Sequence, residues 1–483
     1  MICVSIKGPT LKEALNQLEK AEGLADLVEM RFDLFEIIDI NEIKELQKSC
    51  ALPMIFTLRS LRQGGSYSAN EGQRIAELKN LATLEPAYLD LDYSLSFSIF
   101  EYVKSQHPKI QLIVSYHDFN KTPADLPPLL NILHQYPADY IKIATMAKNS
   151  LDAFSILQIQ SKRTLAISMG DYGQISRILA PLYKSPWTYA ALDESSVVAP
   201  GQLTSDTLNN LYHYKNLDDT TIPYGLLGSP VSFSFGDIVH NQVMFKLKLK
   251  AIYVKIETQI KELKELLGKA NYLGFAGFSV TMPLKEEILK IISFPDKNVQ
   301  AIGAANTLYI KDHQIYGFNT DGQGALDAIQ EVIDPTDKHI VVLGAGGAAK
   351  AIIYEAVRRG AKVTIANRTI ERAQNLALRF NCSFSSLKEL PAYDILINAT
   401  SHEIPIDPSL ILPDALVMDI SVKPNTKLLL AAAEKGCKTI QGSRMWIHQA
   451  LGQYKIWFPE IDLKKTKDLL ERSVKEALSK HSP

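Results

Sequence analysis

The stretch KHIVVLGAGGAAKAIIYEAVRRG (residues 338–360) joins an apolar strand directly to a glycine-rich turn and a helix, and a second apolar strand, KVTIANR (362–368), follows. A lone GxGxxG pattern is weak, but here the glycines lie between strand and helix, where backbone amides can approach a pyrophosphate. This order predicts a dinucleotide-binding lobe. The turn residues expected to contact the dinucleotide are Gly344, Ala345, Gly346, Gly347 and Ala348.

The end of the second strand indicates which dinucleotide is preferred. NAD-binding lobes place an Asp or Glu there for the ribose 2′-hydroxyl, whereas this chain has Asn367, Arg368 and Thr369. A carboxylate would repel a 2′-phosphate, and Arg368 would attract it. We therefore predict NADP(H), with Thr400 as a further cofactor contact. The alternative for Arg368 is an exposed cation at the start of a helix.

The first half of the chain repeats a different unit, a short apolar, β-branched run followed by a helical stretch. Alternating strands and helices predict a parallel sheet, and eight such units predict an α/β fold of the (β/α)8 TIM barrel type, with an open doubly wound sheet as the alternative. The eight runs are ICVSIK (2–7), LVEMRFDL (27–34), MIFTLR (54–59), YLDLDY (88–93), QLIVSYHDF (111–119), YIKIATM (140–146), TLAISMG (164–170) and WTYAAL (187–192).

Five of these runs carry charged or titratable side chains on the face opposite their apolar stripe, because successive side chains of a strand point to opposite faces. In a TIM barrel the active site lies at the carboxyl ends of the strands, so we expect these side chains to converge in the lumen. The alternative is that they merely cap the ends of strands. They are Glu29, Arg31, Arg59, Asp90, Asp92, His117 and Lys142.

Lys142 and His117 lie on neighbouring runs and suggest a specific chemistry. Desolvation or nearby cations turn a lysine into a nucleophilic amine, which is suited to forming a Schiff base. Histidine is the usual proton shuttle. Together they predict an enzyme that forms an imine and moves a proton beside the imine carbon, and Arg31, Arg59 and Arg177 would bind a carboxylate. The alternatives are a lysine in a structural ion pair, a structural histidine, and surface arginines.

At this point the first half resembles a known family. Its motifs occur in order over about residues 1–205 and are similar to those of type I 3-dehydroquinate dehydratase. They are ADLVEMRFD (25–33), FTLRS followed by GG (56–65), SYHDFNKTP (115–123), YIKIA (140–144), ISMGDYGQISR (167–177) and APGQ (199–202).

The resemblance implies that Lys142 forms an imine with the substrate ketone, and that His117 removes the adjacent proton and helps to expel water. The chain departs from the family at Gln63, where a glutamate is usual, and at Val198, where Ser or Thr is usual. The implied ligands of the substrate's hydroxyls and carboxylate are Glu29, Arg31, Arg59, Arg177 and Gln202.

Motifs around the dinucleotide-binding lobe resemble shikimate dehydrogenase over about residues 222–460. The resemblance implies Lys285 and Asp321 as the catalytic pair, aided by Asn306; read singly, the first two are ordinary loop residues. Gly236 and Val422 depart from the family, which has Ser and commonly Tyr there. The implied substrate ligands are Ser234, Thr281 and Gln449. The motifs are SVTMPLKE (279–286), AANTL (304–308), GFNTDGQG (317–324), INATS (397–401) and GSRMWIHQA (442–450).

The two resemblances fit together, because 3-dehydroshikimate is the product of the first reaction and the substrate of the second. They imply a bifunctional shikimate-pathway enzyme of aromatic amino-acid and chorismate biosynthesis. One rival is a catabolic quinate/shikimate dehydrogenase fusion, which a preference for NAD would favour, and another is a binding or scaffold protein with an inactive barrel. The expected parts are a barrel (1–212), a linker (213–221), a shikimate-binding catalytic lobe (222–335 and 440–483) and an NADP-binding Rossmann lobe (336–439).

Composition narrows the choice of partners. The chain has 483 residues and a net charge of −1, so no global basic field attracts nucleic acid or acidic membranes. Its four cysteines have no CxxC spacing, no metal-ligand cluster is evident, and no run of about 18 apolar residues predicts a membrane span. We therefore expect a cytoplasmic enzyme with small-molecule substrates and without a metal.

Overall fold

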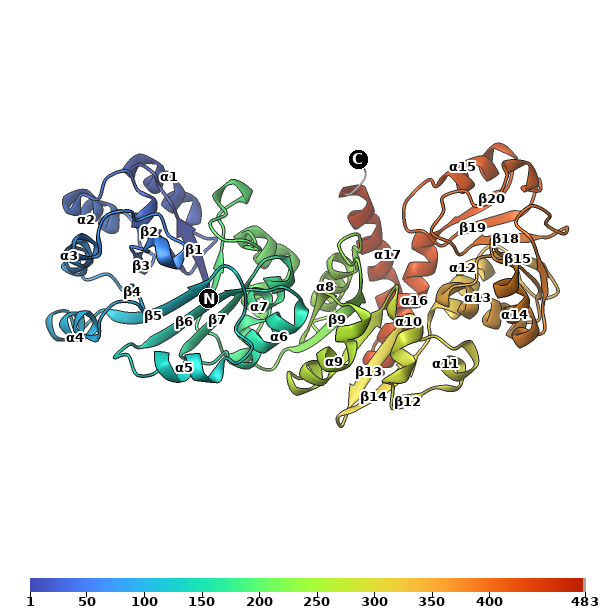
Figure 1. Cartoon of the computed structure of the whole chain (residues 1–483). Helices are drawn as coiled ribbons and strands as arrows, with labels where there is room; N and C mark the ends of the chain where they lie inside the picture. The colour runs from blue at the N-terminus through green and yellow to red at the C-terminus, as the bar shows by residue number, and fades with distance from the viewer. Residues whose placement is uncertain (481–483) are drawn as a thin grey trace. The chain divides into compact units, whose positions relative to one another are not determined.

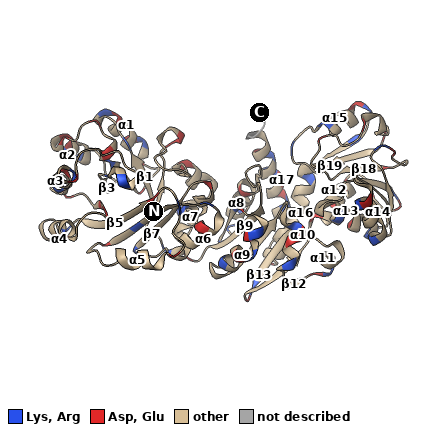
Figure 2. Ribbon diagram, in the orientation of Figure 1, with Lys and Arg blue, Asp and Glu red and all other residues tan. Residues whose placement is uncertain are grey.

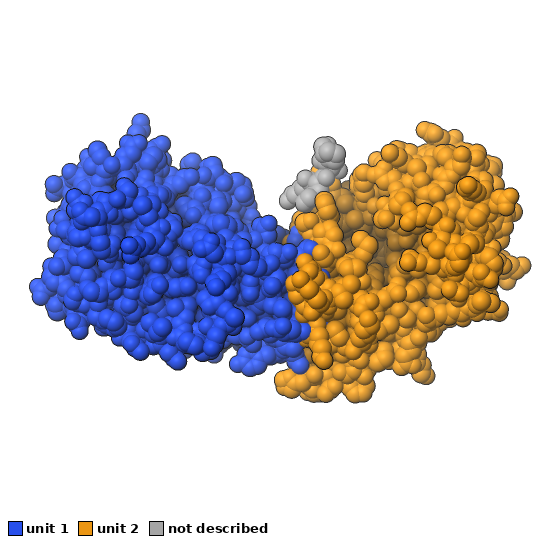
Figure 3. All heavy atoms as spheres, in the orientation of Figure 1, with its two compact units in different colours: residues 1–223, 250–258, 265–274 blue, residues 224–249, 259–264, 275–483 orange. Residues whose placement is uncertain are grey.

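The computed structural model describes residues 1–480 and divides into two compact units (Figure 3). The first contains residues 1–223, 250–258 and 265–274, and the second contains 224–249, 259–264 and the residues from 275 onward. Basic and acidic residues are interspersed along the ribbon of both units (Figure 2). Among the described residues, no helix is long and apolar enough to cross a membrane, and no three His, Cys, Asp or Glu side chains group as metal ligands.

The first unit is a nearly closed barrel of eight parallel strands in the order β7-β6-β5-β4-β3-β2-β1-β8. Each predicted run forms one strand, so the TIM-barrel prediction is confirmed. The strands are β1 (Ile2–Ile6), β2 (Leu27–Arg31), β3 (Met54–Thr57), β4 (Tyr88–Asp92), β5 (Gln111–Asp118), β6 (Tyr140–Met146), β7 (Thr164–Met169) and β8 (Thr188–Ala190).

Helices lie around the outside of these strands (Figure 1). They are α1 (Leu11–Ala21), α2 (Ile40–Ser49), α3 (Glu71–Ala82), α4 (Phe97–Gln106), α5 (Pro127–Leu133), α6 (Ser150–Gln158) and α7 (Gln174–Ile178). Strand parity explains the interior. On the lumen-facing side, apolar residues such as Leu27, Ile55 and Ile113 come first and fill the barrel, and polar residues follow on the same face toward the carboxyl ends of the strands.

The first lobe of the second unit is built on a mixed sheet in which β9, β11, β13, β14 and β12 are successive neighbours. Strands β9 and β11 are parallel, and β13 and β14 form an antiparallel hairpin. Residues 222–330 form the elements that follow, of which β10 and most of α9 belong to the first unit. They are β9 (Ile222–Gly228), α8 (Gly236–Lys246), β10 (Ala251–Glu257), α9 (Leu263–Tyr272), β11 (Gly277–Val280), α10 (Leu284–Glu287), β12 (Phe294–Pro295), α11 (Lys297–Ile302), β13 (Thr307–Lys311), β14 (Gln314–Phe318) and α12 (Asp321–Gln330).

The second lobe is a parallel sheet in the order β17-β16-β15-β18-β19-β20. The order reverses at β15, and this switch point is where doubly wound sheets bind dinucleotides, so the predicted Rossmann lobe is confirmed. Its elements are β15 (His339–Leu343), α13 (Gly347–Arg358), β16 (Lys362–Ala366), α14 (Ile370–Phe380), β17 (Ser383–Ser385), β18 (Ile395–Asn398), β19 (Leu416–Asp419), α15 (Lys427–Glu434) and β20 (Lys438–Gln441). Helices α16 (Gly442–Trp457) and α17 (Leu463–Lys480) follow, and α16 packs on α12.

Candidate active sites

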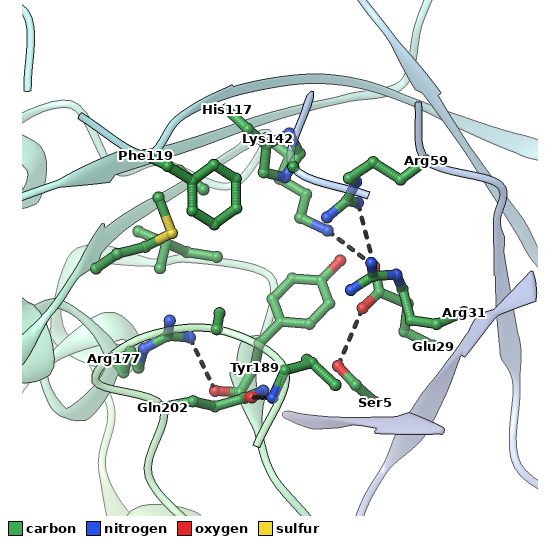
Figure 4. A pocket seen from close by; sticks show the side chains of 16 residues that line it. Ser5, Glu29, Arg31, Arg59, His117, Phe119, Lys142, Arg177, Tyr189 and Gln202 are labelled. Carbon is green, nitrogen blue, oxygen red and sulfur yellow. Dashed lines mark hydrogen bonds and ion pairs between the residues drawn. The ribbon is translucent and has the colours of Figure 1, made fainter. Parts of the chain in front are cut away.

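A pocket at the carboxyl ends of the barrel strands gathers five of the charged or titratable residues that strand parity selected, Glu29, Arg31, Arg59, His117 and Lys142 (Figure 4). Lys142 lies at its centre with a side chain only 3% exposed, and its Nζ donates to Glu29 Oε1 at 2.9 Å and to Asp90 Oδ2 at 3.0 Å. The aromatic ring of Tyr189 lies on another side of the same nitrogen, with its centroid 4.0 Å away. The nitrogen of Lys142 thus lies between two carboxylates and an aromatic ring, which are contacts that favour a positive charge at this position.

The charges immediately around Lys142 balance each other. Arg59 Nη2 lies 2.8 Å from Asp90 and 3.5 Å from Glu29, so two cations face two anions. Burial would raise the pKa of Glu29, but Lys142 and Arg59 together hold that pKa well below its usual range. The same cations lower the pKa of Asp90 against the effect of burial. Neutral hydroxyls of Ser5 and Ser115 donate to these carboxylates at 3.0 and 2.5 Å, which leaves the buried charges well paired.

His117 lies beside Lys142 across the β5–β6 pair, and its environment is different. Within residues 1–480, neither ring nitrogen finds a hydrogen-bond partner, although both atoms are buried. Burial, and then the nearby cations Arg59 and Lys142, hold the pKa of His117 well below its usual range. The ring is therefore neutral, with one nitrogen free to accept a proton.

The remaining predicted ligands of the barrel also line the pocket. Arg31 is bound through two hydrogen bonds, of 2.8 and 2.7 Å, to Asp33, so a negative neighbour already fixes its orientation. Arg177 donates to the backbone oxygen of Tyr189 at 3.2 Å, and its buried Nε has no partner in the described part of the chain. Gln202 Oε1 accepts the Val198 N–H at 3.0 Å. Arg177 thus keeps a donor for a ligand.

Two of the predicted carboxylates, Asp90 and Asp92, do not line the pocket itself. Asp90 still binds two residues that do, Lys142 and Arg59, whereas Asp92 is bound at 2.7 Å by Arg74 of helix α3. Ser5 and Tyr189 line the pocket, although sequence analysis did not select them. Both lie on the lumen-facing side of a strand, and only the alternation of side chains along the strand could have identified them from the sequence.

A second lysine–carboxylate pair lies in the second unit. Lys285 Nζ is 2.5 Å from Asp321 Oδ2, with side chains that are 20% and 6% exposed. Asp321 is the first residue of α12, where the helix dipole favours a negative charge. Asn306 Nδ2 donates to Asp321 Oδ1 at 2.9 Å and to Gln449 Oε1 at 3.2 Å. The structure therefore brings four of the predicted residues together.

The other two predicted ligands of this site lie on neighbouring loops. Thr281 follows β11 and opens the turn that leads into α10, which carries Lys285. Ser234 lies between β9 and α8, where its Oγ accepts the Gly236 N–H at 3.1 Å. The loops meet through a hydrogen bond from the Ser229 N–H to the Met282 oxygen at 3.0 Å. Both residues thus belong to loops at the same end of parallel strands β9 and β11.

The glycine-rich turn has the shape that a pyrophosphate needs. Gly344 has a φ of +116°, and a Cβ there would lie 3.1 Å from the Ala399 oxygen, so glycine is favoured. A Cβ on Gly346 would meet no described atom within 4 Å, which leaves open space beside the turn. A Cβ on Gly347, the first residue of α13, would lie 3.3 Å from Lys285 Cβ. The turn that includes Ala345 and Ala348 therefore lies next to Lys285.

A cavity of about 570 Å³ follows the second strand of this lobe and is lined by Asn367, Arg368 and Lys388, together with residues 405–407. Asn367 Nδ2 donates to the Thr369 oxygen at 2.9 Å, and Thr369 starts helix α14. The cavity is large enough for a nucleotide. Two cations, Arg368 and Lys388, and one carboxylate, Asp407, line the cavity, so its lining carries a net positive charge that fits a dinucleotide with an additional phosphate.

Thr400 lies beside the glycine-rich turn, because a Cβ on Gly344 would be 3.1 Å from Thr400 Cγ2, and the Thr400 hydroxyl donates to Asn398 Oδ1 at 2.8 Å. Asn398 ends strand β18, next to β15 at the switch point. Lys388 and residues 405–407 were missed because they follow β17 and β18 in loops without a recognisable motif.

Comparison with known families gives a consistent assignment along the chain. Residues 2–219 match the model of type I 3-dehydroquinase. Residues 226–308 match the shikimate dehydrogenase substrate binding domain. Residues 327–428 match shikimate/quinate 5-dehydrogenase.

Individual relatives agree over both units. The chain is 35% identical to the shikimate biosynthesis protein AroDE of Chlamydia pneumoniae, over 99% of this chain and 100% of that protein. It is also 35% identical to the chloroplastic bifunctional 3-dehydroquinate dehydratase/shikimate dehydrogenase of Arabidopsis thaliana, over 95% of this chain and 82% of that protein.

Two solved structures resemble about half of the chain. A shikimate dehydrogenase in complex with NADP+ is 36% identical over 53% of this chain and 97% of its own, with a TM-score of 0.50. The Thermus thermophilus shikimate 5-dehydrogenase in complex with shikimate is 28% identical over 53% and 100%, also with a TM-score of 0.50. With both units accounted for, the chain belongs to the family of bifunctional 3-dehydroquinate dehydratase/shikimate dehydrogenases of the shikimate pathway.

Proposed function

We propose that each unit performs one of two consecutive reactions, with Lys142 as the nucleophile of the first and Lys285 as the proton donor of the second. The barrel would convert 3-dehydroquinate to 3-dehydroshikimate, and the second unit would reduce 3-dehydroshikimate to shikimate with NADPH. The observation that carries this proposal is the pair of lysines, each within 3.0 Å of a carboxylate and each in a different environment.

In the barrel, the Lys142 ammonium first gives up a proton, and the freed electron pair of its nitrogen bonds to the ketone carbon of 3-dehydroquinate. The ketone oxygen takes up that proton and a second one from the nitrogen, and leaves as water. The product is a protonated imine, which keeps the positive charge where Glu29, Asp90 and the Tyr189 ring already face it. The electrostatic environment of the free enzyme thus also suits the intermediate.

His117 then acts twice. Its neutral ring takes a proton from the carbon next to the imine, and the electron pair moves toward the imine nitrogen. The electron pair returns as the neighbouring hydroxyl departs, and His117 gives its proton to that hydroxyl so that it leaves as water. A further water hydrolyses the imine and restores Lys142. Arg177, whose buried Nε has no partner among the described residues, would bind the substrate carboxylate, and Glu29, Arg31, Arg59 and Gln202 would complete the site.

The glycine-rich turn of the second unit would hold NADPH, which would supply the hydride for reduction at the ketone carbon of 3-dehydroshikimate. The Lys285 ammonium donates a proton to the ketone oxygen, and Asp321 holds that ammonium in place. Asn306 orients Asp321, and Gln449, Thr281 and Ser234 would hold the substrate's hydroxyls and carboxylate. Glycines 344, 346 and 347 with Ala345, Ala348 and Thr400 would hold the cofactor, and Asn367, Arg368 and Thr369 its 2′-phosphate.

The predicted domain boundaries, cellular location and lack of a nucleic-acid partner are also proposals. The division into a barrel (1–212), a linker (213–221), a shikimate-binding lobe (222–335 and 440–483) and an NADP-binding lobe (336–439) is supported by the family matches on either side of residue 220. The lack of a nucleic-acid partner rests on the near-neutral charge. A cytoplasmic location rests on the four cysteines, whose spacing suggests no disulfide framework.

The direct test gives the purified protein 3-dehydroquinate and NADPH. We expect NADPH absorbance to fall and shikimate to accumulate in equal amounts, and an unchanged absorbance would contradict the bifunctional proposal. Borohydride added during turnover should trap a covalent adduct at Lys142, located by mass spectrometry of peptides. An active enzyme that is not trapped there would contradict the imine.

A further inference from the structure

The loop after strand β3 is pressed against the end of strand β5, which carries His117. It forms a tight 3-10 turn (Leu61–Gln63) closed by the backbone N–H groups of Gln63 and Gly65, which donate to the Ser60 oxygen at 3.0 and 2.9 Å. Gly64 has a φ of +73°, and a Cβ there would lie 2.0 Å from the ring of Phe119. Any larger residue would push the loop away from β5.

This packing buries Gln63 and directs its side chain at the backbone of His117. Gln63 Oε1 accepts the His117 N–H at 2.9 Å, over a separation of 54 residues. The paired register of β4 with β5 ends at Ser115, and the last backbone bond from that side is from the Tyr93 N–H to the Ser115 oxygen. Gln63 therefore supplies the acceptor that strand β4 no longer offers.

The amide of Gln63 adds no charge near the His117 ring. The cations around the pocket are Arg31, Arg59, Lys142 and Arg177, and each of the nearby carboxylates is already paired: Glu29 and Asp90 with Lys142, and Asp33 with Arg31. Tyr189 faces the pocket with its hydroxyl protonated, because burial raises its pKa. Asp118, the next residue of β5, accepts the Asn120 and Lys121 N–H groups outside the pocket.

The ring itself has no hydrogen-bond partner among the described residues, as both of its nitrogens show. Phe119 lies beside it, with the two ring planes 17° apart and their centroids separated by 6.4 Å. The ring is thus oriented through its own backbone and by Phe119, and within the described chain no carboxylate fixes its tautomer.

We propose that Gln63 is a positioning residue of the dehydratase, which fixes His117 through the main chain and, being uncharged, leaves the imidazole neutral so that it works as a base without a carboxylate partner. This inference rests on the proposed role of His117. It predicts that dehydration persists to a lower pH than it would with an acid at residue 63, because a protonated ring cannot accept the substrate proton.

The decisive variant is Gln63→Glu, measured as the pH profile of kcat/KM for dehydration of 3-dehydroquinate without NADPH. A carboxylate close to the ring stabilises its protonated form, so we expect the acidic limb to move upward by about one pH unit or more. Gln111→Glu is the matched control, because it places the same charge on the exposed opposite end of β5, six residues away. That control should leave the acidic limb of the pH profile of kcat/KM unchanged.

Gln63→Leu tests the positioning role separately. It removes the acceptor for the His117 N–H without adding charge, so we expect kcat to fall roughly tenfold, with KM changed less than about twofold and the acidic limb unmoved. An unmoved limb in an active Gln63→Glu variant would overturn the proposal, and so would an unchanged kcat in Gln63→Leu. If Gln63→Leu does not fold, the Gln63→Glu profile alone decides.

A His117→Ala variant distinguishes a wrong role for His117 from a wrong role for Gln63. If a His117→Ala variant dehydrated at the normal rate, the proposed function of His117 would be wrong, whatever the Gln63 variants do. If His117→Ala were inactive, the Lys142 adduct still formed in Gln63→Glu, and the limb stayed in place, only the inference about Gln63 would fail.

Discussion

The two lysines proposed as catalytic differ in how much water they meet. The side chain of Lys142 is 3% exposed and faces Glu29 and Asp90, whereas that of Lys285 is 20% exposed and faces Asp321 alone among the described carboxylates. A lysine that forms a covalent imine benefits from a closed pocket that excludes water and holds the charged intermediate. A lysine that only donates a proton can lie at an open edge where a substrate and a dinucleotide meet. One residue type therefore serves two chemistries because its surroundings differ.

Lys142→Ala should have the largest effect, because the described residues of the barrel pocket include no other lysine that could form the imine. We expect dehydration to fall roughly 10⁴-fold or more, while reduction of 3-dehydroshikimate by NADPH stays unchanged. Product formation from each substrate, measured separately, checks this. Lys104→Ala is the control, since Lys104 pairs with Asp139 on the outside of the barrel. Substantial dehydration by Lys142→Ala would refute covalent catalysis.

Asp321→Asn tests the role of the more exposed Lys285–Asp321 pair. Lys285 loses the charge that holds its ammonium, so reduction should slow by roughly 10²–10⁴-fold while dehydration is unaffected. Steady-state NADPH oxidation with 3-dehydroshikimate measures the change. Asp327→Asn on the same helix removes a carboxylate that pairs with Arg359 and should leave kcat close to normal. Equal losses in the two variants would mean that the effect is structural.

Arg368→Ala should change only the preference of the second unit for NADPH over NADH. A charged hydrogen bond contributes about 1.5–3 kcal/mol, so KM for NADPH should rise roughly 10–100-fold while KM for NADH changes little. Initial rates with both cofactors provide the measurement. Lys362→Ala, at the other end of β16, is the control cation. A similar rise for NADH would contradict recognition of a 2′-phosphate and favour a catabolic, NAD-dependent enzyme.

The smallest expected effect is that of Ser115→Ala, which leaves all four charges around Lys142 in place. It removes the hydrogen bond from Ser115 to Asp90 and should destabilise the barrel by about 1.5–3 kcal/mol. The thermal midpoint of the barrel, followed by calorimetry, should fall by about 5 °C, with dehydration only a few-fold slower. Loss of activity as large as that of Lys142→Ala would show that Asp90 depends on Ser115 for its position.

Strand parity made the barrel site largely predictable. Glu29, Arg59, His117 and Lys142 were selected because each is polar at a lumen-facing position of an apolar strand, and the structure brings them into one pocket. Tyr189 satisfies the same parity, but an aromatic residue in a strand is ordinary core, so composition did not mark it. The ring's approach to Lys142 depends on β8 closing next to β1, which is a property of the whole barrel.

Side-chain pairing could not be foreseen in the same way. Asp90 and Asp92 are equivalent by parity, and only the tertiary position of Arg74 on α3 draws Asp92 away from the pocket. The bond from His117 to Gln63 joins residues 54 apart and depends on how tightly one loop turns. In the second unit, the Lys285–Asp321 pair was indicated by motif order alone, because each residue lies in a loop or at a helix start, where charged residues are common.

One chain is proposed to hold two independent active sites whose reactions follow each other. Mixing two variants, each of which lacks one site, tests this proposal. With 3-dehydroquinate and NADPH, Lys142→Ala alone and Lys285→Met alone should each produce almost no shikimate, and only the Lys285→Met sample should accumulate 3-dehydroshikimate. An equimolar mixture should oxidise NADPH and produce shikimate. A mixture that stays inactive while each variant retains its other activity would contradict the account.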